Sequence, residues 1–172
     1  QLVAAMNPCR CGMAGEPGYR CARGPRCKAD YQARISGPLL DRIDLRIEVP
    51  AVSATDLIAP VQAETSATVA ARVARARDTQ RLRYAELQLD GVSTNAQCSA
   101  AVIEKVAAPD AGGLALMREA SEKLGFSARA YHRVLKVART LADLDGTMRI
   151  GRQHLAEALS YRALADDMRR AA

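Results

Sequence analysis

The sequence predicts a mainly helical α/β chain, in which two short strands and a cysteine-rich loop precede a group of helices. Three observations support this fold class. Apolar and charged residues alternate in "IDLRIEVP", as in a half-buried strand. From about residue 64 onward, apolar residues recur at helical spacing. Aromatic residues make up only 3% of the chain, so a core must consist mainly of Leu, Val, Ile and Ala.

The first sixty residues contain both predicted strands. The opening apolar run indicates a short buried strand, and Gly and Pro residues in the segment after it exclude regular structure. We place a domain boundary near residue 60, where a connector leads into the helices. The expected elements of this part are a strand at 1–6, a cysteine loop at 8–28, a short helix at 28–35 interrupted by Ser36-Gly37-Pro38, a strand at 43–49 ending at Pro50, and a connector at 51–63.

The second part, residues 61–172, is expected to be helical. Its best specified helix starts after Ser127, which can cap it, while Gly125 closes the helix before it. One face of this helix is expected to be core, and the opposite face is a basic stripe that either meets water or contacts phosphate. The expected helices are 64–89, 97–107, 112–124, 127–144 and 151–165; the core face is Tyr131, Val134, Leu135, Ala138, Leu141 and Ala142; the basic stripe is Arg129, Arg133, Lys136 and Thr140.

The net charge of +6 comes mostly from arginine and makes a polyanionic partner such as nucleic acid or nucleotide phosphate plausible. No apolar run approaches the roughly 20 residues that cross a bilayer, and no charged leader precedes an apolar core. We therefore expect a cytoplasmic protein without a membrane partner.

Four cysteines stand close together in a loop that has almost nothing apolar to bury. Cys9, Cys11, Cys21 and Cys27 would supply the four thiolates of a tetrahedral Zn²⁺ site. Unliganded thiols and oxidised pairs are the alternatives, although a reducing cytoplasm disfavours disulfides. Cys98 lies far from this group in sequence and is interpreted as an ordinary small apolar residue.

Four phrases together resemble the C-terminal portion of the magnesium-chelatase-like AAA+ ATPases, the ComM/YifB family. They are "LVAAMNPC", "ARISGPLLDRIDLRIEVP", "LGFSARAYHRVLKVARTLADLDG" and "RQHLAEALSYR", and the resemblance covers essentially the whole chain. It implies the end of a P-loop αβα ATPase core in residues 1–60, followed by a helical linker and lid. It also implies ATP and Mg²⁺ as cofactors of the full-length protein and a homo-oligomeric ring, expected to be a hexamer.

The resemblance assigns roles to three residues. Asn7 corresponds to the sensor 1 residue that positions water near the γ-phosphate. Arg42 corresponds to an arginine finger that reaches the neighbouring subunit's nucleotide, and Arg129 to the sensor 2 arginine of the lid. Each residue also has a structural alternative: Asn7 capping a turn, Arg42 pairing with Asp41 or Asp44, and Arg129 as a solvated surface charge.

The chain itself contains no G-x-x-x-x-G-K-[ST] phosphate loop and no apolar strand ending in paired acidic residues. We therefore expect no ATP hydrolysis by this chain alone. The family resemblance implies a DNA helicase that promotes branch migration during the integration of transforming DNA. The alternative function is a zinc-stabilised basic module that binds DNA or assists assembly without nucleotide chemistry.

Overall fold

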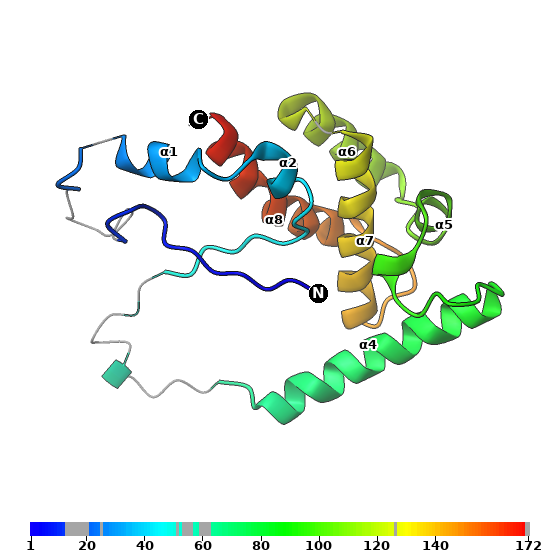
Figure 1. Cartoon of the computed structure of the whole chain (residues 1–172). Coiled ribbons are helices and arrows are strands. Elements are labelled where there is room, and N and C mark those ends of the chain that lie inside the picture. The colour runs from blue at the N-terminus through cyan, green and yellow to red at the C-terminus, as the bar shows by residue number, and fades with distance from the viewer. Residues whose placement is uncertain are drawn as a thin grey trace.

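The computed structural model describes residues 1–12, 21–24, 26–50, 52, 57–58, 63–125 and 127–170. Within these ranges all regular structure is helical, and the helices after residue 95 form a compact group beside the long helix α4 (Figure 1). The elements are α1 (Cys27–Gln32), α2 (Gly37–Leu40), α4 (Ser66–Glu86), the 3₁₀ helix η1 (Asn95–Gln97), α5 (Ala100–Val106), α6 (Ala111–Leu124), α7 (Ala128–Leu144) and α8 (Arg152–Arg170).

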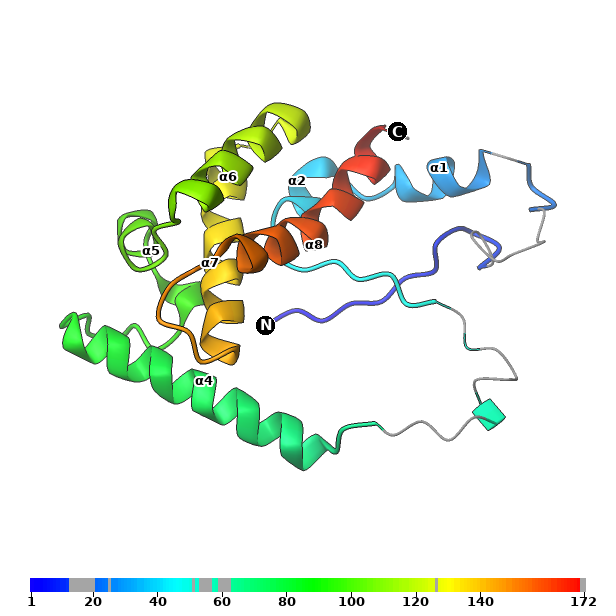
Figure 2. The same ribbon diagram turned by 180° about the vertical axis from the view of Figure 1, so that it is seen from behind.

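Helix α7 is the centre of the helical group and contacts α8, α4, α5 and η1 (Figures 1 and 2). Its predicted start is confirmed, because the Ser127 hydroxyl accepts the Ala130 N–H at 3.2 Å and Gly125 ends α6 at a φ of 61°. The predicted core face is confirmed as well: four of its residues are fully buried, and Tyr131 and Leu141 pack against them. The four are Val134, Leu135, Ala138 and Ala142.

Helices α6 and α8 approach each other closely at Gly113. A Cβ atom built on this glycine would lie 2.6 Å from Leu155 Cδ1 and 3.0 Å from Pro109 Cβ. The absence of a side chain at Gly113 therefore sets how near the start of α6 comes to α8. Asp110 caps the same turn by accepting the Gly113 N–H at 2.7 Å.

The helix predicted at 97–107 begins three residues later than expected. A 3₁₀ turn ends at Gln97, and α5 begins only at Ala100 because the Ser99 side chain caps it by accepting the Val102 N–H at 3.4 Å. The long helix predicted at 64–89 is present as α4 and is buried only in its second half, at Ala76, Gln80 and Tyr84.

The two predicted strands are absent from the part of the chain that the structure describes. Residues 1–7 and 43–50 have no regular secondary structure. The prediction of a buried strand at 1–6 is wrong for this chain, since Leu2 and Val3 are 73% and 86% exposed. Ile47 is likewise 68% exposed. A strand needs a partner to satisfy its backbone groups, and none is present among the described residues.

Candidate functional site

The cysteine loop contains two turns of the same shape. In the first, the Gly12 N–H donates to the Cys9 carbonyl at 3.0 Å; in the second, the Gly24 N–H donates to the Cys21 carbonyl at 3.0 Å. Both glycines have a left-handed φ, 83° and 86°, which glycine adopts without steric cost. The spacing of the cysteines does not reveal this similarity, because the first turn holds two of them and the second holds one.

The turns bring the cysteine sulfurs together. The Sγ atoms of Cys9, Cys11 and Cys27 all lie within 4.8 Å of one another. Cys9 Sγ and Cys11 Sγ are 2.7 Å apart, and Cys21 Sγ lies 3.4 Å from Cys11 Sγ. The structure thus gathers the four cysteines that the sequence singled out, and it places the thiols of Cys9 and Cys27 in buried positions.

This donor set fits a Zn²⁺ ion. Tetrahedral coordination with Zn–S bonds of about 2.3 Å separates ligand sulfurs by about 3.8 Å, so Cys9 and Cys11 would move apart by about 1 Å. The pKa of the Cys21 thiol is raised to about 11: the backbone N–H of Arg23 lowers it, but hydrogen bonds to the thiols of Cys11 and Cys27, partial desolvation and repulsion by Cys11 together outweigh that effect. A divalent cation would reverse this balance by stabilising the thiolates.

A small pocket of about 230 Å³ lies beside the cysteine cluster. One wall is a single face of α1 and the residues just after it, since Asp30, Tyr31 and Arg34 lie three, four and seven positions after Cys27. The other wall carries one arginine from each cysteine turn, Arg10 and Arg23. Three guanidinium groups and one carboxylate make this pocket suited to an anion.

The remaining cysteine and both histidines have partners outside the cysteine cluster. Cys98 is buried in the helical core, with its thiol 3.8 Å from the Thr94 carbonyl, as expected for a small apolar residue. His132 Nε2 lies 2.8 Å from Glu104 Oε1. His154 Nδ1 accepts the Gly151 N–H at 2.9 Å, which leaves its Nε2 to donate to Asp145.

Arg42 directly follows the C-cap residue of α2, and its side chain is exposed. It donates from Nη1 to the Pro38 carbonyl at 3.0 Å. The alternative interpretation, an ion pair with Asp41 or Asp44, does not occur in the described part of the chain. Asp41 instead accepts from Arg162 Nη2 at 3.1 Å, and Asp44 accepts from Arg133.

Arg129 lies in the first turn of α7 and is exposed, close to the N–H groups at the start of the helix. The other three residues of the predicted basic stripe have partners within the protein, so the stripe is not a surface open to water or phosphate along its whole length. Arg133 pairs with Asp44, Lys136 donates to the Ala96 carbonyl at 2.9 Å, and Thr140 accepts from the Asn95 side chain. The prediction that this face of α7 meets water or contacts phosphate is therefore corrected. Periodicity predicts which residues share a helix face, but only the packing of α7 shows which groups lie against that face.

Asn7 is exposed and lies next to the first cysteine turn, with its Nδ2 3.6 Å from where a Cβ on Gly12 would stand. No hydrogen bond or ion pair joins Asn7, Arg42 and Arg129 within the ranges that the structure describes. The three residues thus lie in three places: beside the cysteine loop, after α2 and at the start of α7.

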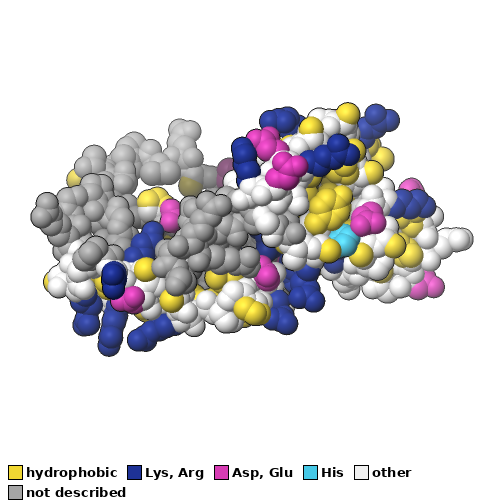
Figure 3. Space-filling model, turned by 90° about the horizontal axis from the view of Figure 1, so that it is seen from above, with side chains coloured by type: hydrophobic (Ala, Val, Ile, Leu, Met, Phe, Trp, Pro, Cys, Tyr) yellow, Lys and Arg dark blue, Asp and Glu magenta, His cyan; other side chains and the backbone are white. Residues whose placement is uncertain are grey.

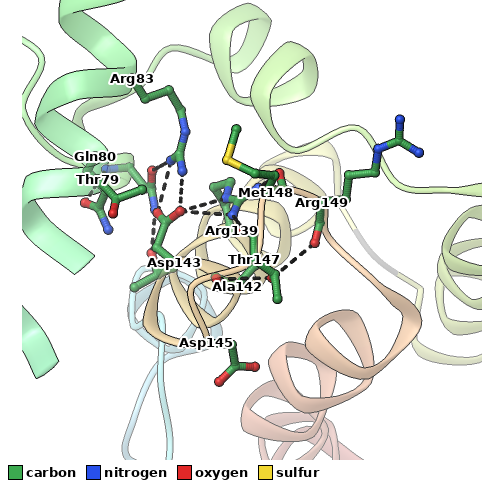
Figure 4. Close-up of polar contacts among 12 residues, drawn as sticks. Thr79, Gln80, Arg83, Arg139, Ala142, Asp143, Asp145, Thr147, Met148 and Arg149 are labelled. Carbon is green, nitrogen blue, oxygen red and sulfur yellow. Dashed lines mark hydrogen bonds and ion pairs between the residues drawn. The ribbon is translucent and has the colours of Figure 1, made fainter. Parts of the chain in front are cut away.

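A buried polar network was not anticipated from the sequence (Figure 4). Asp143, whose side chain is fully buried, accepts from both Arg83 and Arg139, and from Asn95 Nδ2 at 2.9 Å. Arg139 also donates to the carbonyls of Thr147 and Met148 at 2.6 and 2.7 Å. Burial lowers the pKa of Arg139, although the Asp143 charge opposes the shift. The sequence signal for this network is an Arg and an Asp four residues apart on the apolar side of α7.

None of the described helices is long and apolar enough to cross a membrane. On the face drawn in Figure 3, Lys and Arg side chains stand in several groups with acidic side chains among them. The net positive charge is therefore not gathered into a single patch on this face.

Two family models match the chain. The C-terminal domain of the magnesium chelatase subunit ChlI matches residues 63–162, and the magnesium chelatase subunit ChlI model matches residues 1–57. The competence protein ComM of Haemophilus influenzae is 41% identical over 165 residues, and YifB of Escherichia coli is 42% identical over 167 residues. YifB of Salmonella typhimurium is 39% identical over 165 residues. Each match covers 95% of this chain, which spans 31% of the length of these relatives.

Proposed function

Because the chain belongs to the magnesium-chelatase-like ComM/YifB family, we propose that it is the C-terminal portion of a ring-forming AAA+ ATPase that acts as a DNA branch-migration helicase in natural transformation and recombination. ATP and Mg²⁺ are the cofactors of the full-length protein, and DNA is its partner. The ring is a homo-oligomer, expected to be a hexamer, working in the cytoplasm. The relative in Haemophilus influenzae is named a competence protein, in keeping with this role.

In this proposal residues 1–60 complete the ATPase core and residues 61–172 form the linker and lid. The two family matches support a boundary near residue 60, since one ends at 57 and the other begins at 63. Asn7 acts as sensor 1, Arg42 as the arginine finger and Arg129 as sensor 2. Cys9, Cys11, Cys21 and Cys27 hold a Zn²⁺ ion that orders the loop at 8–28.

The observation that carries the proposal is the environment of Arg42. Its neighbours Asp41 and Asp44 are occupied by Arg162 and Arg133, while its own guanidinium is exposed and donates to the Pro38 carbonyl. An arginine that acts on another subunit must be accessible and must not be neutralised by a carboxylate beside it. Arg129 supports the proposal in the same way, since an exposed cation at a helix N-terminus suits a phosphate.

ATP hydrolysis by the full-length protein tests the proposal, measured with and without branched DNA. We expect Mg²⁺-dependent turnover that falls to background in Arg42→Ala, and movement of a DNA branch point that requires ATP. The matched control is Arg81→Ala, which removes an exposed arginine of α4 paired with Asp78. A full-length protein that binds ATP normally but hydrolyses none in any DNA condition contradicts the proposal.

The pocket beside the cysteine cluster favours a second candidate function, a zinc-stabilised module that binds DNA without nucleotide chemistry. Arg10, Arg23 and Arg34 would hold backbone phosphates, and Tyr31 offers a ring on which a base can stack. Fluorescence anisotropy of labelled DNA with the isolated chain tests this candidate. Binding that is lost in Arg23→Gln, together with a full-length protein lacking ATPase activity, would favour it over the first.

A further inference from the structure

The segment that carries Arg42 is attached on both sides to the helices of the second part of the chain. On one side, Asp41 accepts from Arg162 of α8 at 3.1 Å. On the other side, Asp44 accepts from Arg133 of α7. These two ion pairs flank Arg42, whose side chain stays exposed.

We propose that α7 positions Arg42 through the Asp44–Arg133 ion pair. The helix that carries Arg129 then also sets the position of the Arg42 guanidinium, which acts on the nucleotide of the neighbouring subunit. The inference rests on the proposed function and deepens it, because it adds Asp44 and Arg133 as positioning residues of the same ATPase. Neither residue touches the nucleotide; both act through Arg42.

The spacing along α7 supports this link. Arg129 and Arg133 are four residues apart, so they lie on one face of the helix about 6 Å apart along its axis. Any movement of α7 that brings Arg129 to a phosphate therefore also displaces Arg133, the partner of Asp44. Arg42 lies between Asp44 and the anchored Asp41, so a displacement of Asp44 reorients the short segment that carries the guanidinium.

The two ion pairs differ in exposure, which assigns them different roles. Arg162 is 6% exposed and its partner Asp41 29%, whereas Arg133 is 26% exposed and Asp44 55%. Ion pairs open to solvent are screened and weak, so they form and break readily, whereas a buried arginine resists losing its partner. The Asp41–Arg162 pair is therefore the lasting anchor, and the Asp44–Arg133 pair is the contact that opens and closes during a cycle.

The test uses the full-length protein with Asp44→Asn, Arg133→Gln and the exchanged pair Asp44→Arg/Arg133→Asp. An exposed ion pair contributes at most about 1 kcal/mol and can bias the position of Arg42 by no more than that, so we expect each single variant to lower kcat about two- to fivefold. The KM for ATP should stay within about twofold, because the nucleotide contacts are intact. The exchanged pair should recover most of the rate, since it restores the attraction.

The matched control is Glu64→Gln, which breaks another solvent-exposed ion pair, that of Glu64 and Arg72, with 53% and 41% of their side chains exposed. We expect this control to hydrolyse ATP at the wild-type rate. A further variant combines Asp44→Asn with Arg42→Ala. It should be no slower than Arg42→Ala alone, because the link acts only through Arg42.

Three results would overturn the inference. They are wild-type kcat in Asp44→Asn, a loss of rate that the exchanged pair does not recover, and a combined variant markedly slower than Arg42→Ala. If wild-type protein hydrolyses no ATP, the proposed function fails and the inference with it. If only Arg42→Ala is inactive, the proposed function stands and the inference alone fails.

Discussion

Arg139 Nε donates to Asp143 Oδ1 at 3.1 Å across one turn of α7, and both side chains are almost completely buried. Asp143 also binds Arg83 of α4, while Arg139 binds two carbonyls in the turn before α8. The Asp143 carboxylate therefore joins α4 to α7, and the Arg139 guanidinium ties α7 to the turn that leads into α8. Removal of this carboxylate tests whether the network holds the helical group together.

Asp143→Asn should lower the free energy of unfolding by about 3–5 kcal/mol, because it leaves two arginines with an uncompensated charge in a buried place. Urea denaturation of the chain followed by circular dichroism measures the change. The control is Asp78→Asn, whose partner Arg81 is exposed, and it should cost no more than about 1 kcal/mol. Equal midpoints for the two variants would show that the network adds nothing to stability.

The purified chain should contain about one equivalent of zinc, because a polar loop lacks any other means of ordering its cysteines. Metal analysis of protein prepared under reducing conditions and without chelator measures the content. Cys27→Ser should lose the metal, whereas Cys98→Ala, which changes a cysteine of the helical core, should retain it. Less than about a tenth of an equivalent of any metal in the wild-type chain rules out this site.

The isolated chain should bind ATP only weakly and should not hydrolyse it, because the phosphate loop supplies most contacts to the β- and γ-phosphates and is not part of this sequence. A phosphate-release assay on highly purified chain measures turnover. The informative comparison is Arg129→Ala. Turnover by the wild-type chain that vanishes in this variant contradicts the prediction, because contaminating activity would persist in both proteins.

In the full-length ring, Arg42→Ala should lower ATP hydrolysis on the order of 10³-fold or more while nucleotide binding and folding remain nearly intact. The reason is that a finger stabilises charge only in the transition state of the neighbouring site. ATP hydrolysis by rings that mix wild-type and mutant subunits provides the measurement. Each mutant subunit with an intact phosphate loop should abolish hydrolysis at its neighbour's site rather than at its own. If a ring of only mutant subunits hydrolyses ATP at the wild-type rate, Arg42 is an ordinary surface charge and not an arginine finger.

Local patterns predicted the helical part of the fold well. The helix predicted at 112–124 is α6 and that at 127–144 is α7, each beginning within one residue of its expected start. Capping residues and apolar periodicity act over a few residues, so they can be read from the sequence directly. The strands predicted at 1–6 and 43–49 were not found among the described residues, because a strand depends on a partner that can come from any distance along a chain.

For the candidate site, too, local features could be predicted from the sequence and long-range contacts could not. Four cysteines within nineteen positions match the number of thiolates in a tetrahedral Zn²⁺ site, and the family resemblance indicates Asn7, Arg42 and Arg129. Which charges meet could not be predicted, because long-range ion pairs depend on how helices pack. Asp44 and Arg133 are 89 residues apart and Asp41 and Arg162 are 121 apart.

The sequence by itself determined where α6 and α7 start, which face of α7 is apolar and which thiols stand close enough along the chain to share a metal ion. These properties follow from spacing and from local backbone preferences. Only the tertiary structure decided that Arg133 holds Asp44 instead of meeting phosphate, that Arg139 is buried on Asp143, and that Arg42 stays exposed between two occupied aspartates. The physical reason is that a charged side chain takes its partner from whatever packing brings within reach, and packing is a property of the whole chain.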